Sequence, residues 1–271
     1  MRVGLIGCGA IGRSIIDRLR VDPSESFAIA ALYVRARQIP EVRALCARPA
    51  SELVVTADWR EFLAADLDLV VEAAGQQAVL DHAQAVLEQG CDLQVLSIGA
   101  LASPDLRARL MRAARETGCT ICVPAGALAG FDGLLALRRS GLVSVTYTST
   151  KPPEAWRGTI AERNFRLEDL WQPQVLFRGS AMEAALNYPQ NANLAAAVAL
   201  AGAGFEATRV ELIADPAATG NTGRVRAVAH GTTLDLTLTC QSFGNNPKTS
   251  QITAVSVLSS IENSLATVKF V

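Results

Sequence analysis

Residues 2–20 read RVGLIGCGAIGRSIIDRLR, and this stretch decides the fold. Residues 2–7 form a nearly continuous apolar run, typical of a strand covered on both faces of a parallel sheet, and residues 10–20 have helical spacing. Between them lies a GxGxxG turn, Gly7-Cys8-Gly9-Ala10-Ile11-Gly12. The first glycine permits a tight turn, the second lets the backbone approach a pyrophosphate, and the third lets helix and strand pack closely. The stretch therefore predicts a dinucleotide-binding turn at a helix N-terminus, with a ligand-free glycine turn as the alternative.

The rest of the first half alternates short β-rich runs with longer helical stretches. Further strands are expected at residues 27–34, 68–73, 92–98 and 119–124. Helices are expected at residues 38–47, 77–89 and 103–116, the last with Ser103 as N-cap before Pro104. Repeated strand–helix units indicate an α/β fold with a Rossmann-type, doubly wound parallel sheet, which we assign to residues 1–123.

The second half has longer strands, which indicate a second, α+β domain over residues 124–246. Strands are expected at residues 142–150, 174–178, 207–214, 224–230 and 232–240, and helices at 180–186 and 191–202. Thr and Asp alternate with Leu over residues 232–240, which predicts an antiparallel sheet with one solvated face. Residues 247–271 are expected to return to the first domain. Their amphipathic helix is predicted from Thr249 to about Leu265, with an apolar face of Ile252, Val255, Leu258 and Ile261.

Composition excludes several classes of partner. The 25 Lys and Arg balance 26 Asp and Glu, for a net charge of −1, so no basic surface is expected for nucleic acid. Charged residues interrupt each long apolar stretch, so we expect no membrane-spanning helix. Arg13, Asp17 and Arg18 follow the first glycines too closely for a secretory leader. The six scattered cysteines fit reduced thiols in a cytoplasm, with Cys119 and Cys122 as small buried hydrophobes and no metal site.

Residues 32–37, LYVRAR, bear on the choice between NAD and NADP. An NAD-selective site usually has Asp or Glu at the end of the second strand, and this segment has no carboxylate. Arg35 and Arg37 could instead form bidentate hydrogen bonds with a 2′-phosphate. The segment therefore favours NADP, or use of both cofactors, unless the two arginines are ordinary solvated loop residues.

Small residues follow two further strands of the predicted sheet. They are Ala73, Ala74 and Gly75 after one strand, and Ser97 and Gly99 after another. The carboxyl edge of a doubly wound sheet is where the cofactor lies, so these residues are candidate contacts of its ribose and nicotinamide. The alternative is that they form ordinary strand-to-helix turns. Glu72 is interpreted as a solvated residue at a strand end.

Six stretches of the chain resemble the L-aspartate dehydrogenase family. They are GLIGCGAIGR (4–13), VVEAAGQQAV (70–79), VLSIGALA (95–102), PAGALAGFDG (124–133), FRGSAMEAALNYPQNANLAA (177–196) and NNPKTSQITAVSV (245–257). The resemblance implies a Rossmann domain closed by a C-terminal helix, an inserted α+β domain, a homodimer, and NAD(P)-linked oxidation of L-aspartate to iminosuccinate. It also implies that Ala127 and Asn193 lie next to the cofactor. We expect Asn191 to cap the helix that follows and Asn193 to be the ligand.

One departure from the family affects the expected chemistry. The family has an Asn-Thr-His-Glu stretch whose histidine is thought to act as acid and base, and here residues 221–224 read NTGR, with Gly223 at the histidine's position. Glycine carries no proton, and acid–base assistance is commonly worth about 10²- to 10⁴-fold in rate. The two histidines of the chain are poor substitutes: His82 is expected to be a surface or packing residue, and His230 lies about 23 Å along an extended chain unless a bend brings it back.

Lys151 and Asn221 remain as candidate catalytic residues. Lys151 ends a predicted strand before two prolines, where it could bind a substrate carboxylate or, if buried, have a shifted pKa; a solvated lysine is the alternative. We expect the nicotinamide over an interdomain cleft, in a group of residues formed by Ser97, Gly126, Ala127, Lys151, Asn193 and Asn221. Because Gly223 removes the acid–base group, we expect imine reduction, oxidation of another amino acid or amine, or slow turnover of aspartate. A non-catalytic dinucleotide-binding sensor is the alternative function.

Overall fold

The computed structural model describes residues 1–46, 53–244 and 246–270, and the chain divides into two compact units. Unit 1 contains residues 1–124 and 257–270, and unit 2 contains residues 125–256. We expected the returning segment to begin at residue 247, whereas unit 1 resumes at Val257. None of the helices in the described ranges is long and apolar enough to cross a membrane.

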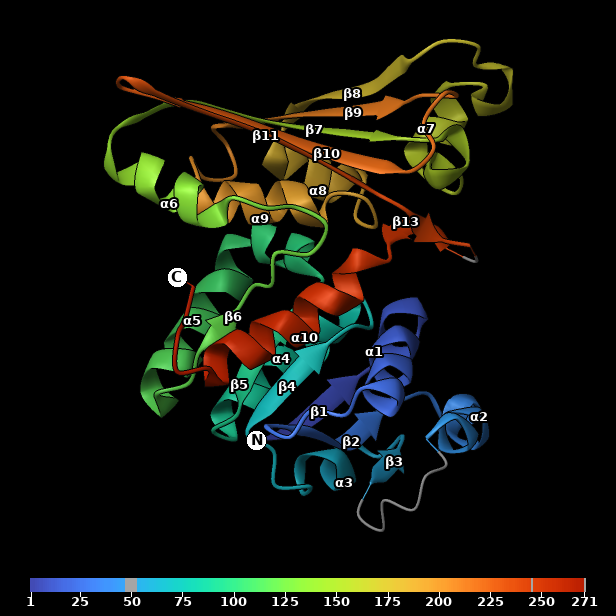
Figure 1. The fold of residues 1–271 in the computed structure, drawn as a ribbon, viewed down its shortest axis with the longest axis vertical. Coiled ribbons are helices and arrows are strands. Elements are labelled where there is room, and N and C mark those ends of the chain that lie inside the picture. The colour runs from blue at the N-terminus through green and yellow to red at the C-terminus, as the bar shows by residue number, and fades with distance from the viewer. Residues whose placement is uncertain (47–52, 245, 271) are drawn as a thin grey trace. The chain divides into compact units, whose positions relative to one another are not determined.

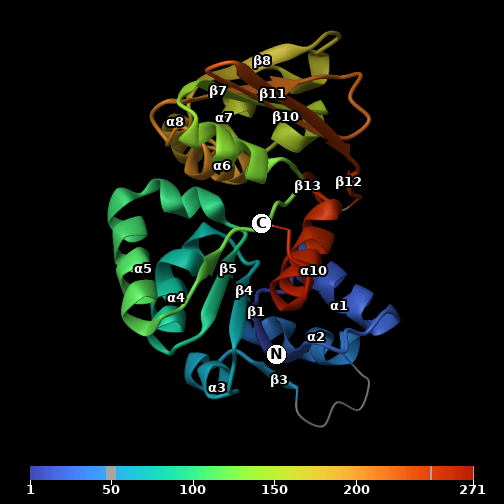
Figure 2. The same cartoon turned by 60° about the vertical axis from the view of Figure 1, so that its left-hand side comes forward.

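Unit 1 is built on a parallel six-stranded sheet in the order β3-β2-β1-β4-β5-β6. The strands are β1 (Arg2–Ile6), β2 (Ala28–Tyr33), β3 (Val54–Thr56), β4 (Leu69–Glu72), β5 (Asp92–Val95) and β6 (Ile121–Cys122). The helices are α1 (Ala10–Val21), α2 (Ile39–Leu45), α3 (Trp59–Leu63), α4 (Gln76–Glu88), α5 (Pro104–Thr117) and most of α10 (Ile252–Leu265). Figures 1 and 2 show α4 and α5 on one face of the sheet and α1 and α10 on the other. The predicted Rossmann-type doubly wound sheet is thus confirmed.

Several elements of unit 1 differ from their predicted bounds. The strand expected over 92–98 ends at Val95, and residues Ile98–Ala102 form the 3₁₀ helix η2. The helix expected over 38–47 consists of the 3₁₀ turn η1 (Ala36–Gln38) and α2, and residue 47 lies outside the described residues. Neither β3 nor α3 was predicted, since three and five residues are too short to show a period.

The start of α5 and the CxxC pair were also predicted. Ser103 caps α5 as expected, with its hydroxyl accepting the N–H of Leu106, and Pro104 begins the helix. Cys119 and Cys122 are half-buried rather than buried, and of the two only Cys122 lies within β6. Within the described ranges, no three His, Cys, Asp or Glu side chains are grouped to hold a metal ion.

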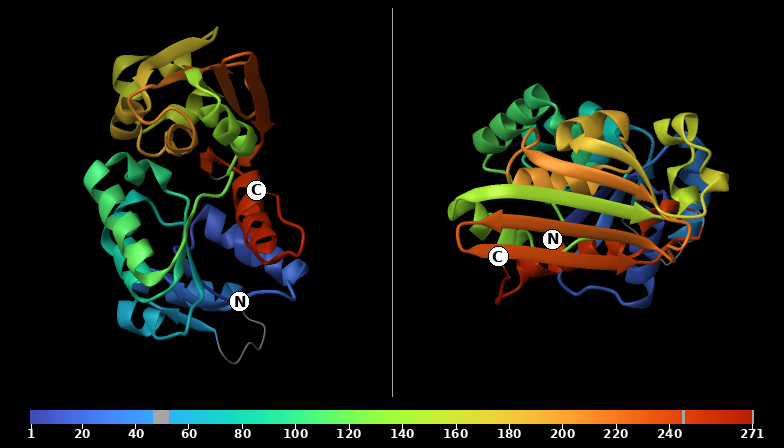
Figure 3. Two further views of the ribbon diagram at one scale, coloured as in Figure 1. Left: turned by 90° about the vertical axis from the view of Figure 1, so that its left-hand side faces the viewer. Right: turned by 90° about the horizontal axis from the view of Figure 1, so that it is seen from above.

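Unit 2 has a five-stranded sheet in the order β11-β10-β7-β9-β8. The strands are β7 (Leu142–Lys151), β8 (Gln174–Ser180), β9 (Thr208–Ala214), β10 (Asn221–Ala229) and β11 (Thr232–Cys240). The helices are α6 (Phe131–Arg139), α7 (Ile160–Asn164), α8 (Ala181–Asn187) and α9 (Asn193–Ala201), with 3₁₀ turns η3 (Pro153–Trp156) and η4 (Leu167–Asp169). Helices α6, α8 and α9 lie on one face of this sheet, as Figure 1 shows. Figure 3 (right) looks onto the opposite face.

The predicted antiparallel sheet is wrong at one pair of strands. β7 and β9 run parallel, while β10 pairs antiparallel with both β7 and β11, and β8 pairs antiparallel with β9. Residues 152–207 form the crossover that a parallel pair requires. The alternation of polar and apolar residues has the same period in both kinds of strand, so it could not reveal this direction.

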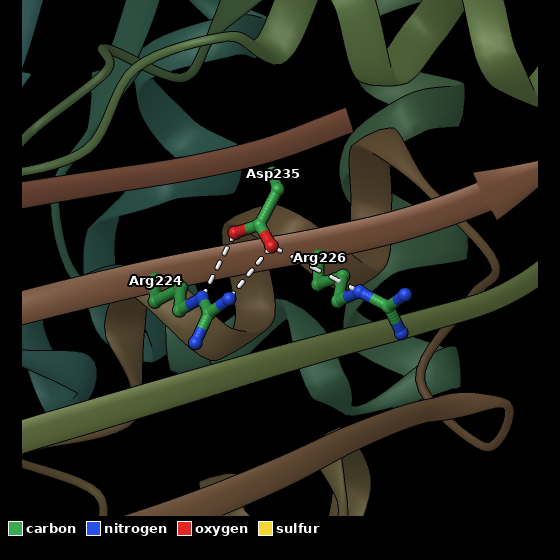
Figure 4. A network of polar contacts seen from close by, with 3 residues as sticks. All are labelled: Arg224, Arg226 and Asp235. Atoms are coloured by element: carbon green, nitrogen blue, oxygen red, sulfur yellow. Dashed lines mark hydrogen bonds and ion pairs between the residues drawn. The ribbon is translucent and has the colours of Figure 1, made fainter. Parts of the chain in front are cut away.

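The predicted solvated face of the sheet is present on β11. Thr233, Asp235, Thr237 and Thr239 are exposed. Both oxygens of Asp235 accept hydrogen bonds from the Arg224 guanidinium, at 2.8 and 2.7 Å, and Arg226 lies 3.9 Å away (Figure 4). Arg224 thereby lowers the pKa of Asp235. Exposed ion pairs of this kind contribute little to stability, so the fold rests on the buried face.

The C-terminal helix begins later than predicted and buries a different stripe. Thr249 and Ser250 belong to β13 (Asn246–Ser250), which pairs with β12 (Ser242–Phe243), so α10 begins at Ile252. Its buried residues are Ala254, Val257 and Ile261, whereas Ile252 is 39% exposed. Of the four predicted positions only Ile261 is buried, because a small alanine gives a weak signal in an apolar pattern.

One buried carboxylate joins the carboxyl ends of β4 and β5. Glu72 is 1% exposed, and its Oε1 accepts hydrogen bonds from the backbone N–H groups of Ala74 and Gly75 and from the Ser97 hydroxyl. Its Oε2 accepts the backbone N–H of Ser97. The prediction of a solvated residue was wrong, because β4 is a central strand whose last side chain lies between two loops.

Replacing Glu72 should therefore destabilise the protein. Glu72→Ala leaves several buried donors without an acceptor, at about 1–3 kcal/mol each, so we expect a loss of about 3 kcal/mol or more in the free energy of unfolding. Glu72→Gln keeps the shape of the side chain but places an amide NH₂ against the backbone N–H of Ser97. It should therefore lose less free energy of unfolding than Glu72→Ala. Urea unfolding of both variants measures this, with Glu88→Ala, at an exposed position near the end of α4, as a control expected within about 0.5 kcal/mol of the parent. Equal stability of Glu72→Ala and the parent would contradict the role of this carboxylate.

Candidate active site

The glycine turn connects β1 to α1 in unit 1. Gly7 has φ +93°, a conformation that favours glycine, and its N–H donates to the carbonyl of Tyr33 at the end of β2. Gly9 is the N-cap of α1, which begins with Ala10 and Ile11, and no side chain caps the helix. The first amides of α1 are thus left for a ligand, which suits an anion.

The space around the turn fits a pyrophosphate. A Cβ on Gly12 would lie 2.5 Å from the carbonyl oxygen of Gly7, and a Cβ on Gly7 would lie 2.8 Å from the Cβ of Ala74. A Cβ on Gly9 would meet nothing within 4 Å. The turn is therefore packed tightly on the protein side and open at Gly9, where a phosphate group needs backbone access. Cys8 is buried, and burial raises the pKa of its thiol to about 11, so it acts as a protonated packing residue.

The loops after β4 and β5 lie at the same sheet edge. The N–H of Ala73 donates to the carbonyl of Ile6, which holds the first loop against β1. Gly75 has φ +129° and open space around it. The Ser97 hydroxyl is engaged by Glu72 rather than free for a cofactor, and Gly99 is buried within η2.

Arg35 and Arg37 follow β2 closely. The Val34 N–H donates to the carbonyl of Thr56, which fixes the end of the strand, and η1 begins at Ala36. Both arginines are exposed, and within the described ranges neither guanidinium has a carboxylate partner. They are thus free to bind an anionic group near this edge.

In unit 2, Ala127 and Asn193 belong to neighbouring segments. The Gly126 N–H donates to the Ser256 hydroxyl at 3.0 Å, and a Cβ on Gly126 would lie 3.2 Å from Leu194. Ala127 is buried, and Asn193 is the first residue of α9. The expected helix cap is wrong: Ala192 is the N-cap of α9, and the Asn191 amide instead donates to the carbonyl of Ala155.

Lys151 is a buried cation at the end of β7. It is 8% exposed, and its Nζ donates to the backbone carbonyl of Lys248 at 2.9 Å and lies 5.7 Å from the ring centre of Trp156. Burial, together with the nearby Lys248 ammonium, lowers the pKa of Lys151 to about 8. In the described part of the chain no carboxylate lies within ion-pair distance of it. Buried charges are normally paired, so this arrangement is typical of a functional group.

Asn221 and Gly223 lie within β10, which begins three residues earlier than predicted. The Asn221 amide nitrogen donates to the carbonyl of Pro247 at 3.2 Å and to the Ser250 hydroxyl at 3.3 Å. These acceptors fix its orientation, and its Oδ1 is buried without a hydrogen-bond partner. Such an orphaned acceptor is costly unless a ligand donates to it.

Gly223 pairs with Ser149 of β7. A Cβ at this position would lie 3.3 Å from Leu128 and 3.4 Å from the Tyr147 hydroxyl, so a larger side chain would have to displace them. Ser149 and Tyr147 are each 1% exposed, and the sequence analysis missed both. The signal that could have found them is the alternation in VTYTSTK, which places Tyr147, Ser149 and Lys151 on one face of the strand.

Each histidine contacts residues of its own unit. The His82 ring stacks on Trp59 at 4.1 Å in an aromatic cluster of unit 1 that includes Tyr33. His230 follows the far end of β10, 3.0 Å from where a Cβ on Gly141 would lie. Of the surface and packing roles expected for His82, packing is the one observed.

Two glycine substitutions should separate binding from folding. Gly9→Ala adds a methyl group in open space, so stability should be unchanged, while the dissociation constant for a dinucleotide should rise tenfold or more because the methyl group faces the pyrophosphate. Gly12→Ala should instead destabilise by about 1–3 kcal/mol through its clash with the Gly7 carbonyl. Titration calorimetry and thermal unfolding measure the two effects. Unchanged dinucleotide affinity in Gly9→Ala would contradict the proposed grip on the pyrophosphate.

Comparison with known proteins gives matches along nearly the whole chain. The family model "Aspartate dehydrogenase, C-terminal" matches residues 132–264, and "Homoserine dehydrogenase, NAD binding domain" matches residues 7–124. The L-aspartate dehydrogenase of Ralstonia pickettii is 40% identical over 265 residues, covering 97% of each chain. L-aspartate dehydrogenase 2 of Bordetella bronchiseptica is also 40% identical, covering 98% of this chain and 97% of its own.

A solved structure has the same fold. The crystal structure of aspartate dehydrogenase from Thermotoga maritima superposes with a TM-score of 0.76 at 24% identity, covering 100% of this chain and 99% of that one. This likeness supports the arrangement of elements described above. With the family models and the 40% identical relatives, it places the chain plainly: it belongs to the L-aspartate dehydrogenase family.

Proposed function

We propose that this NAD(P)-dependent dehydrogenase acts on the carbon–nitrogen bond of an amino acid or amine, with L-aspartate and iminosuccinate, or a close relative of them, as the substrate pair. The observation that carries the proposal is the buried pair of Lys151 and Asn221, a cation without a carboxylate and an acceptor without a donor. An amino acid or amine brings an amino group that can satisfy this acceptor, beside a lysine that no described carboxylate neutralises. The names of the relatives support the same choice of substrate.

The roles of the two units follow from their groups. In unit 1 the amides at the start of α1 hold the pyrophosphate, and Glu72 fixes the two loops beside the turn. In unit 2 the buried polar groups bind and orient the substrate. NAD(P)⁺, when bound, supplies the hydride acceptor, so the protein contributes mainly binding, orientation and proton transfer.

Gly223 gives the reaction a preferred direction. Without an imidazole at this position, the usual base that activates water for attack on the imine is missing. Hydride transfer to an imine, by contrast, depends chiefly on positioning. We therefore propose that imine reduction is favoured over aspartate oxidation near neutral pH.

Assays in both directions at pH 7 test this function. We expect NAD(P)H oxidation to proceed with the imine that forms in solution from oxaloacetate and ammonia, and L-aspartate oxidation to fall below about 1 s⁻¹, the bottom of the ordinary enzyme range. A panel of other amino acids and simple amines is measured in parallel. Aspartate oxidation at ordinary dehydrogenase rates would contradict the altered direction, and dinucleotide binding without turnover across the panel would favour the sensor alternative.

Cofactor choice gives a further prediction. If Arg35 and Arg37 bind the 2′-phosphate, calorimetry at fixed ionic strength should give a lower dissociation constant for NADP than for NAD. Arg35→Ala and Arg37→Ala should weaken NADP binding about tenfold and leave NAD binding unchanged. Arg109→Ala, at an exposed position of α5, is the matched control and should change neither. Tighter binding of NAD by the parent protein would overturn this assignment.

The family also suggests a cytoplasmic homodimer, which we include in the proposal. Light scattering at micromolar protein concentration measures the mass, and a mass of one chain would contradict the dimer.

A further inference from the structure

Three polar side chains form a row on the buried face of β7. Tyr147, Ser149 and Lys151 alternate with less buried threonines, and each is at most 8% exposed. Ser149 pairs with Gly223 across the β7–β10 ladder. Thr150 pairs with Thr222, so Lys151 and Asn221 are the next positions along the two strands and lie on the same face as Gly223. Lys151 and Gly223 are therefore diagonal neighbours on one face. Such neighbours lie about 7–8 Å apart, a distance that a lysine side chain can span.

The lysine nitrogen is held without being neutralised. Its hydrogen-bond partner is a backbone carbonyl, that of Lys248, and the Lys248 ammonium is engaged by the side-chain oxygen of Gln190. Across the strand, the Asn221 Oδ1 is a buried acceptor without a donor. A substrate amino group would satisfy this acceptor and would then lie beside the lysine.

We propose that Lys151, and not an imidazole, exchanges the proton of the substrate nitrogen in this enzyme, with Asn221 Oδ1 holding that nitrogen. The inference rests on the function proposed above. It adds to that function the identity of the acid–base group in a chain that has glycine at the histidine's position.

The other titratable groups near Gly223 are unsuited to this role. Burial raises the pKa of Tyr147 far above its usual value, and its hydrogen bond to Ser149 offsets this only in part. Burial also raises the pKa of the Cys240 thiol. His82 packs in the aromatic cluster of unit 1, and His230 follows the far end of β10. Of Tyr147, Cys240 and Lys151, only Lys151 changes charge readily near neutral pH.

Each oxidation moves one proton from the substrate nitrogen and one hydride from the adjacent carbon. In oxidation, the neutral Lys151 amine accepts a proton from the substrate ammonium, a hydride leaves the adjacent carbon for NAD(P)⁺, and the nitrogen lone pair forms the C=N bond. The products are the iminium, NAD(P)H and the Lys151 ammonium, which returns its proton to water. In reduction, the Lys151 ammonium donates the proton that converts the product amine to its ammonium form.

The charge state of Lys151 then sets the direction. With a pKa of about 8, roughly nine in ten Lys151 side chains carry the proton at pH 7, which serves reduction and limits oxidation. Oxidation should therefore rise with pH up to about 8. Among the described charged groups, only the Lys248 ammonium acts on the pKa of Lys151, and it lowers it. Removing the Lys248 charge should raise that pKa and move the limb of the profile to higher pH.

The test begins with the unmodified protein. The chain has three lysines, so [¹⁵Nζ]lysine labelling should give three side-chain signals, assigned by the variants below. We expect Lys151 to titrate near pH 8. A Lys151 midpoint above about 10 would overturn the proposal without any variant.

Kinetics with L-aspartate, or the best substrate of the panel, complete the test. Lys151→Met should lower kcat for oxidation about 10²- to 10⁴-fold and abolish the pH limb, while KM changes less than about threefold. Added methylamine should restore part of the rate, which it would not do for a purely structural loss. Lys151→Arg keeps the charge but not the pKa, so it should fail in the same way.

Two further variants complete the comparison. Lys248→Met should move the limb to higher pH, and Lys269→Met should behave like the parent. A change in KM alone in Lys151→Met would assign the lysine to carboxylate binding and overturn the proposal. A pH profile whose limb Lys248→Met does not move would overturn it as well. Absence of turnover by the parent enzyme across the panel would instead refute the proposed function itself.

Discussion

Unit 1 depends on one close contact, between α1 and the turn that precedes it. A Cβ on Gly12 would lie only 2.5 Å from the Gly7 carbonyl oxygen, so helix and strand approach at a distance that only glycine permits. That approach places the uncapped start of α1 at the carboxyl edge of the sheet, next to Ala74. Glu72 then fixes the two following loops at the same edge with four hydrogen bonds. The proposed pyrophosphate site is thus built by backbone packing rather than by charged side chains.

Unit 2 solves a different physical problem. A buried ammonium without a carboxylate and a buried amide oxygen without a donor each reduce the stability of a fold. Lys151 and Asn221 lie together on the covered face of the sheet, where apolar residues would pack at lower cost. Departures of this kind concentrate at functional sites, where a bound ligand supplies what the protein lacks.

Much of the fold, but less of the site, could be predicted from the sequence. The parallel sheet and its glycine turn were predicted because both depend on local period and on backbone freedom at Gly7–Gly12. The environment of Glu72 could not be, since its four donors come from loops that only the folded sheet brings together. Asn221 was expected before a strand and lies inside one, because Gly223 weakens the local β signal. The orphaned oxygen of Asn221 likewise depends on Pro247 and Ser250, far along the chain.

The order of the two units along the chain has a consequence for biosynthesis. Unit 2 is continuous, whereas unit 1 is interrupted between residues 124 and 257. Val257 and Ile261 of α10 are buried at 0% and 2% exposure, so the nascent first segment leaves the apolar surface beneath them uncovered. At 5–20 residues per second, the ribosome needs roughly 7–26 s to make the intervening stretch. Throughout that interval the emerging polypeptide exposes an apolar surface that chaperones can bind, until the final helix has been translated.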